Sequence, residues 1–81
     1  MKHEFSKNFL KELFSFPLST QKKFEKQLKF LILDIRHPSL RAKKYDESGG
    51  IWQARVDKNV RFFFEINGDI YTLLNIKNHP K

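Results

Sequence analysis

Apolar and polar residues alternate through most of residues 51–76, and this period of two predicts β-strands. Residues 57–59 favour a tight turn, and Asn67-Gly68 is the strongest short hairpin signal in the chain. Together these signals predict an antiparallel meander of three strands, at 51–56, 60–66 and 70–76. Arg55 and Arg61 fall on the side of the first two strands that is opposite to the apolar side.

The predicted sheet has one apolar face, which the rest of the chain must cover. In the first two strands this face holds Trp52, Ala54, Val56, Val60, Phe62, Phe64 and Ile66. In the third strand the alternation places Ile70, Thr72, Leu74 and Ile76 opposite Tyr71, Leu73, Asn75 and Lys77. Each set shares a face because its members recur at every second residue.

A helical period marks the first segment that can cover the sheet. Ser6 is a good N-cap, and Pro17 ends the helix because the residue before a proline avoids helical backbone angles. A short strand, His3-Glu4-Phe5, is predicted ahead of this helix. The apolar stripe of the helix consists of Phe9, Leu10, Leu13 and Phe14.

A second helix is predicted from a cap at Ser19 or Thr20 to about Arg36, before His37-Pro38. We expect part of the connector 39–47 to pair as an edge strand. The buried stripe of the second helix consists of Phe24, Leu28, Leu31, Ile32 and Ile35.

The predicted fold class is α+β, with an N-terminal helical hairpin packed on a twisted antiparallel β-sheet. The chain of 81 residues is expected to form one domain, residues 1–81. It has no cysteine for disulfides or a thiolate metal site, and no apolar run near the roughly 20 residues of a membrane span. We therefore expect a cytoplasmic protein with no membrane contact.

Positive charge sets the class of partner. The formal net charge is +7 and the sequence pI is about 9.9, a balance that favours nucleic acid or an acidic protein as partner over a merely soluble surface. The cationic residues near the connector and the strands are candidate RNA contacts: Arg41, Lys43, Lys44 and Lys77.

Arg55 and Arg61 are the candidate catalytic cations. They lie across a predicted hairpin, where opposed side chains come within about 5 Å, and two guanidinium groups so placed repel each other unless an anion lies between them. A phosphate is the natural anion, and as surface arginines the two are expected to contribute little to stability. The alternative is that they pair with nearby carboxylates: Glu65, Asp57 or Asp69.

His79 follows the last strand and is the candidate acid or base, because imidazole exchanges protons near neutral pH. These residues suit RNA cleavage by its own 2′-hydroxyl, a reaction that requires proton transfer and cations but neither a metal ion nor a cofactor. His3, His37 and His79 lack the close spacing of metal ligands. The alternative for His79 is a solvated surface histidine. Trp52, Phe63 and Tyr71 suit either base stacking or core burial.

Several segments through nearly the whole chain form a recognisable pattern: residues 5–13, the joint at Pro17, and residues 37–44, 51–56 and 61–66. Together they resemble the RelE/ParE toxins of type II toxin–antitoxin systems. The resemblance implies a microbial RNase-like fold, an antitoxin that wraps the toxin in a hetero-oligomer and, for the RelE branch, cleavage of ribosome-bound mRNA, which inhibits translation.

The same resemblance implies roles for individual residues. Arg61 matches the arginine that the RelE pattern uses on the scissile phosphate, and Arg55 stands where that pattern has a lysine. Gln53 stands where another lysine is usual, so one charge is lost. His79 falls where the pattern has an arginine, or a catalytic histidine in some relatives, and the tyrosine that often follows has no counterpart before Lys81. Two alternatives therefore stay open: a ParE-like toxin that inhibits gyrase, and a catalytically decayed member that only binds its antitoxin.

Overall fold

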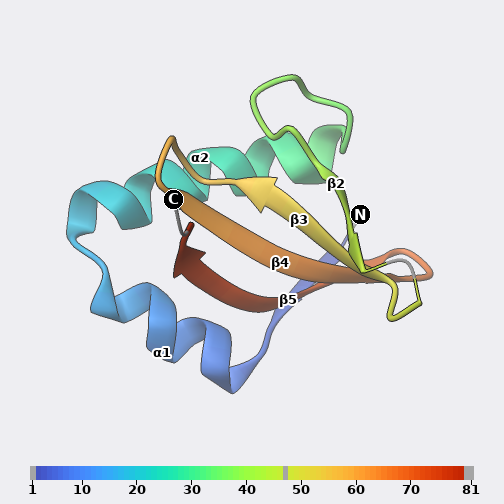
Figure 1. Cartoon of the computed structure of the whole chain (residues 1–81), viewed down its shortest axis with the longest axis horizontal. Coiled ribbons are helices and arrows are strands. Elements are labelled where there is room, and N and C mark those ends of the chain that lie inside the picture. Colours follow the sequence, from blue (N-terminus) through green and yellow to red (C-terminus); the bar gives the residue numbers. More distant parts are fainter. Residues whose placement is uncertain (1, 47, 80–81) are drawn as a thin grey trace.

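The computed structural model describes residues 2–46 and 48–79, and these form two helices packed on one face of a five-stranded sheet (Figure 1). The α+β class and the N-terminal helical hairpin on a sheet are as predicted. Within the described residues, neither helix is long and apolar enough to span a membrane. The elements in chain order are β1 (Lys2–Phe5), α1 (Lys7–Ser15), α2 (Leu18–Leu33), β2 (Lys43–Asp46), β3 (Ile51–Arg55), β4 (Val60–Asn67) and β5 (Ile70–Asn78).

The strands are ordered β1-β5-β4-β3-β2, and their pairing is mixed. β3, β4 and β5 form the predicted meander, and β2 is the predicted edge strand, antiparallel to β3. The expectation of a wholly antiparallel sheet is wrong at the other edge, because β1 runs parallel to β5. These two strands come from opposite ends of the chain, so no turn residues between them set their relative direction.

The two helices differ in how well the sequence located their ends. Ser6 caps α1 as predicted, since its Oγ accepts a hydrogen bond from the backbone N–H of Phe9 at 3.0 Å. α2 begins at Leu18 directly after Pro17 and ends at Leu33, so the predicted cap at Ser19 or Thr20 and the end near Arg36 are wrong. Proline already has φ −58° here, and its carbonyl accepts the N–H of Gln21 at 3.1 Å, so it opens the helix itself.

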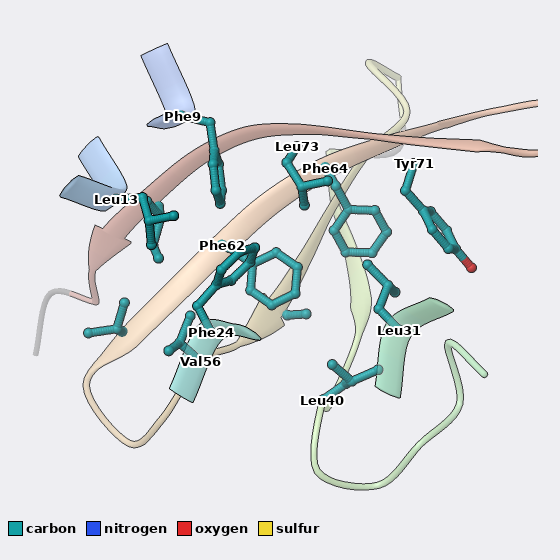
Figure 2. Close-up of a cluster of buried hydrophobic side chains, with 13 residues drawn as sticks. Phe9, Leu13, Phe24, Leu31, Leu40, Val56, Phe62, Phe64, Tyr71 and Leu73 are labelled. Carbon is teal, nitrogen blue, oxygen red and sulfur yellow. The ribbon is translucent and has the colours of Figure 1, made fainter. Parts of the chain in front are cut away.

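The core lies between the helices and the sheet (Figure 2). Phe24 of α2 meets Phe62 of β4 edge to face, with ring centroids 5.3 Å apart. Phe14 was predicted in the stripe of α1 but is 67% exposed, because Phe9 and Leu13 already fill the contact with the sheet. The largest fully buried side chains are Phe9, Phe24, Phe62, Phe64, Leu31, Leu40, Leu73 and Ile76.

A bulge in β5 breaks the alternation expected there. Phe63 pairs with Asn75 while Phe64 pairs with Leu73, so Leu74 is an extra residue in this strand. Tyr71, Leu73 and Ile76 are therefore all buried, although strict alternation placed Ile76 on the opposite face from the other two.

Candidate functional site

The strand face away from the helices carries a cavity of about 330 Å³. Arg55 of β3 and Arg61 of β4 alternate with buried core residues, so they face this side of the sheet. Among the residues that the structure describes, none that lines the cavity carries a carboxylate. We call it the cationic cavity, and its lining residues are Arg41, Lys43, Gln53, Arg55, Arg61 and His79.

Arg55 and Arg61 are direct cross-strand partners, as the hairpin predicted. The next residue in the same row is Lys77, which pairs with Arg61 across β4 and β5. Like charges placed opposite each other on a sheet destabilise it unless an anion compensates them. Over residues 2–46 and 48–79 the one ion pair joins Lys23 Nζ to Asp57 Oδ2 at 3.3 Å, so the alternative pairing of the arginines with carboxylates does not form there.

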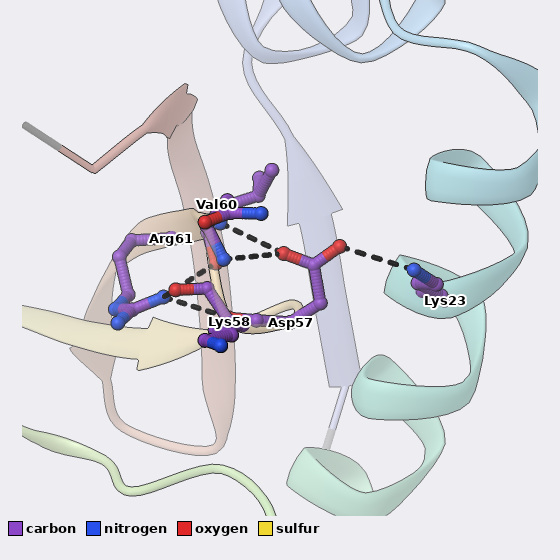
Figure 3. A network of polar contacts seen from close by, with 6 residues as sticks. Lys23, Asp57, Lys58, Val60 and Arg61 are labelled. Carbon is purple, nitrogen blue, oxygen red and sulfur yellow. Dashed lines mark hydrogen bonds and ion pairs between the residues drawn. The ribbon is translucent and has the colours of Figure 1, made fainter.

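The sequence indicated a surface arginine at position 61, but Arg61 is buried, with only 6% of its surface exposed. Its Nη1 donates to the backbone carbonyls of Asp57 at 2.7 Å, Val60 at 3.1 Å and Lys58 at 3.3 Å (Figure 3). Burial and the charge of Arg55 lower the pKa of Arg61; Asp57 opposes this and Arg41 adds to it. The guanidinium therefore closes the β3–β4 turn while keeping its charge close to two other arginines.

Asp57 holds the same turn from the other side (Figure 3). Its Oδ1 accepts the backbone N–H groups of Asn59 at 2.8 Å and Val60 at 2.9 Å. Burial raises the pKa of Asp57, but these hydrogen bonds and Lys23 outweigh it, so the pKa lies below its usual value. The turn that carries Arg61 is thus fixed by a carboxylate that does not line the cavity.

Arg41 enters the cavity from the loop before β2 with a left-handed backbone, at φ 47°. This conformation costs a non-glycine residue free energy and persists only where its surroundings hold it. The loop is fastened at the preceding residue, because Leu40 is fully buried and its carbonyl accepts the N–H of Arg55 at 2.8 Å.

Gln27 of α2 ties the same loop to β3, and sequence reasoning missed it. It is 2% exposed, and its Nε2 donates to the carbonyls of Ser39 at 3.0 Å and Arg55 at 2.9 Å. Ser39 Oγ in turn donates to Gln27 Oε1 at 3.0 Å. The available signal was its position between Phe24 and Leu31, three and four residues away on the buried stripe.

His79, the predicted acid or base, contributes to the lining of the cavity. Its backbone N–H donates to the carbonyl of Asn59 at 2.7 Å, which brings the end of β5 beside the β3–β4 turn. Its side chain is exposed. The structure thus gathers the three predicted catalytic residues, Arg55, Arg61 and His79, at one cavity.

The four predicted RNA-contacting residues divide into two groups. Arg41 and Lys43 line the cavity with Arg55, and Lys77 lies beside Arg61. Lys44 is elsewhere: its Nζ lies 6.0 Å from the ring centre of Trp52, a residue packed against the core. Adjacent residues of a strand face opposite sides, which separates Lys44 from Lys43.

The arrangement can bind one phosphate and move one proton. Arginine forks bind phosphate bidentately, and no carboxylate from residues 2–46 or 48–79 lines the cationic cavity to compete for them. The imidazole of His79 can exchange a proton with a group bound there. Across the part of the chain that the structure describes, no three His, Cys, Asp or Glu side chains gather as metal ligands.

No protein-family model matches the sequence, and no curated protein matches it either. Solved structures do match, although their sequence identities are low. The YoeB/ParE toxin from Agrobacterium tumefaciens has a TM-score of 0.81 at 12% identity, covering 99% of this chain and 100% of that one.

Two further matches are chains from complexes. One is the heterotetrameric YoeB–YefM toxin–antitoxin complex from Staphylococcus aureus, with TM-score 0.79, 15% identity and coverage of 99% and 98%. The other is the RelB–RelE antitoxin–toxin complex from Methanococcus jannaschii, with TM-score 0.73, 22% identity and coverage of 91% and 87%. The chain therefore has the fold of the RelE/ParE toxins.

Proposed function

We propose that this protein is the toxin of a type II toxin–antitoxin system, and that it cleaves ribosome-bound mRNA in the cytoplasm. The observation that carries the proposal is the pair Arg55 and Arg61, which face each other across a hairpin at the wall of the cavity. Neither has a carboxylate partner within the described part of the chain. An arrangement that is repulsive in the free protein is complementary to a phosphodiester. The likeness to YoeB and RelE chains supports the toxin assignment through the fold.

The cleavage step uses the 2′-hydroxyl of the RNA as nucleophile. Its proton passes to a general base, the 2′-oxygen forms a bond to phosphorus, the bond to the 5′-oxygen breaks, and that oxygen takes up a proton. Arg55 and Arg61 stabilise the negative charge that builds on the phosphoryl oxygens, and His79 serves as one of the proton-transfer groups. Arg41 and Lys43 attract the RNA backbone.

The partner is proposed to be a cognate antitoxin. The net charge of +7 favours an acidic protein, and two of the similar structures are complexes of toxin with antitoxin. Co-expression of that antitoxin should relieve growth arrest by this chain and should yield a hetero-oligomer on size-exclusion chromatography.

Expression of the chain alone in cells tests the proposal. Growth should stop, and mapping of RNA 5′ ends should show new 5′-hydroxyl ends within translated mRNA. Arg55→Met and His79→Ala should each remove these ends, whereas Lys26→Met, an exposed lysine of α2 on the opposite side of the molecule, should leave them.

Measurement of DNA supercoiling in the same cells separates the main alternatives. Growth arrest with intact mRNA and altered supercoiling would favour gyrase inhibition. Normal growth, together with binding of an antitoxin, would favour a catalytically decayed toxin. Gln53 in the cationic cavity motivates this alternative, because the family pattern has a lysine at that position.

A further inference from the structure

A second hollow, of about 180 Å³, opens on the sheet face that carries the cationic cavity. Lys77 lines this hollow and pairs in register with Arg61, which lines the cationic cavity, so the two hollows are neighbours on the sheet. We call it the aromatic hollow, and its lining residues are Tyr45, Ile51, Phe63, Asn75 and Lys77.

Two aromatic rings form a corner in this hollow. The ring centroids of Tyr45 and Phe63 are 5.0 Å apart, with an interplanar angle of 70°. Tyr45 is still 63% exposed after this contact, and Phe63 is half-buried. By contrast Trp52 packs against the core and Tyr71 is buried, so of the three aromatics that the sequence offered for stacking only Phe63 faces this side.

Irregular strand pairing surrounds the corner. The pairing of β2 with β3 skips Tyr45, between Lys44 and Asp46, and Leu74 is the extra residue of β5. Bulges of this kind bend strands and are frequent next to functional sites. The corner therefore lies where the sheet departs from flat pleating on two of its strands.

Charge changes sign along β4 on this face. Arg61, Phe63 and Glu65 follow one another at every second residue, so a cation, a ring and a carboxylate lie in sequence. Arg61 and Phe63 are separated by about 6.6 Å along the strand at about 3.3 Å per residue. The sugar of one nucleotide can bridge this span, which places the phosphate at Arg61 and the neutral base at Phe63. The negatively charged phosphate then lies away from the carboxylate of Glu65.

We propose that the aromatic hollow binds one unpaired nucleobase of a single-stranded RNA whose phosphate occupies the cationic cavity. The base stacks on the corner formed by Tyr45 and Phe63, and Asn75 and Lys77 border it. The inference rests on the proposed function, because it takes RNA as the ligand. It adds a base-binding subsite on the side of the Arg61–Lys77 pair away from His79, between β2 and β5.

Two small ligands that differ only in the base provide the test. Adenosine 5′-monophosphate and ribose 5-phosphate are titrated into the full chain, and binding is followed by NMR of the backbone amides and the aromatic rings. Because base stacking on aromatic side chains strengthens binding, the nucleotide should bind about tenfold more tightly than the sugar phosphate. Only the nucleotide should shift the ring signals of Tyr45 and Phe63.

Variants then locate the preference. Tyr45→Ala should bind the two ligands with affinities within about twofold, while Tyr45→Phe should keep the preference because stacking needs the ring and not the hydroxyl. Phe14→Ala is the matched control, since Phe14 is 67% exposed on α1 on the other side of the sheet. It should behave as the unsubstituted protein does.

Three results would overturn the inference: equal affinity for the two ligands, no binding of either at millimolar concentration, or an unchanged preference in Tyr45→Ala. The second and third would each leave the hollow available to a protein side chain instead of a base. Failure of the proposed function would look different. Base-dependent binding without mRNA cleavage in cells would refute the nuclease and retain the subsite.

Discussion

Replacement of Arg61 by methionine should separate its structural contribution from its role in the cavity. Methionine keeps an apolar stem of similar length and removes the guanidinium. Arg61 is 6% exposed and donates to three turn carbonyls, so its loss affects folding as well as charge.

The magnitude follows from which carbonyls lose their partner. The carbonyl of Val60 still accepts the N–H groups of Val56 at 2.9 Å and Asp57 at 3.3 Å. The carbonyls of Asp57 and Lys58 lose the bond to Arg61, at about 1 kcal/mol each, and relief of the repulsion with Arg55 offsets a small part of this loss. The free energy of unfolding should therefore fall by up to about 2 kcal/mol. For a domain of this size that corresponds to a fall in Tm of up to about 8–16 °C.

Arg55→Met is the matched control, because Arg55 lies opposite Arg61 in the same row. Its charge lowers the pKa of Arg61, an effect second only to burial, so removing it relieves repulsion. Stability should therefore stay within about 0.5 kcal/mol of the unsubstituted protein or rise slightly. Urea titration and thermal unfolding monitored by circular dichroism measure both variants, and growth assays measure toxicity, which both should lose.

Equal stability of the two variants would refute the reasoning, since it would mean that Arg61 does not hold the turn. Retention of full toxicity by a folded Arg55→Met protein would instead show that the pair does not bind the scissile phosphate. The two failures are independent, because one is read from unfolding and the other from growth.

Three further outcomes are expected. Gln27→Met should lower stability by about 1–2 kcal/mol and also weaken phosphate binding, measured by NMR titration, because it frees the loop of Arg41. Gln21→Met, also on α2, removes a single 2.9 Å bond to the carbonyl of Phe16 before that helix and should lower stability alone, so equal phosphate affinity in both variants would contradict the assignment. Asp57→Asn should lower the free energy of unfolding by about 1 kcal/mol near neutral pH. The folded pKa of Asp57 lies below the unfolded value of about 3.9, so its contribution to stability is complete above that value and is lost as pH falls through the folded pKa. In strong acid the two proteins should therefore unfold alike. Inorganic phosphate at ten times its Kd should stabilise the protein by about 1.4 kcal/mol in thermal unfolding and should not stabilise Arg55→Met, whereas stabilisation of both would place the anion elsewhere.

The sequence determined most of the fold through local signals. Alternation located the three strands of the meander, Asn67-Gly68 located one hairpin, and Ser6 and Pro17 located the first helix and its end. Because residues in register across a short hairpin are fixed by the turn, the sequence also placed Arg55 opposite Arg61.

Tertiary structure alone decided the features that depend on contacts between distant segments. The parallel direction of β1 and the burial of Gln27 both arise from partners far along the chain. The bulge at Leu74 shifts the register of β5 against β4, which the Asn67-Gly68 turn signal does not specify. Arg61 is a different case, because the carbonyls that its guanidinium contacts lie only one to four residues away. The sequence identified it as a candidate cation, but its burial depends on how the folded turn and strand surround it. Local sequence encodes period and turn chemistry, whereas packing and the pairing of remote polar groups are settled only when the whole chain has folded.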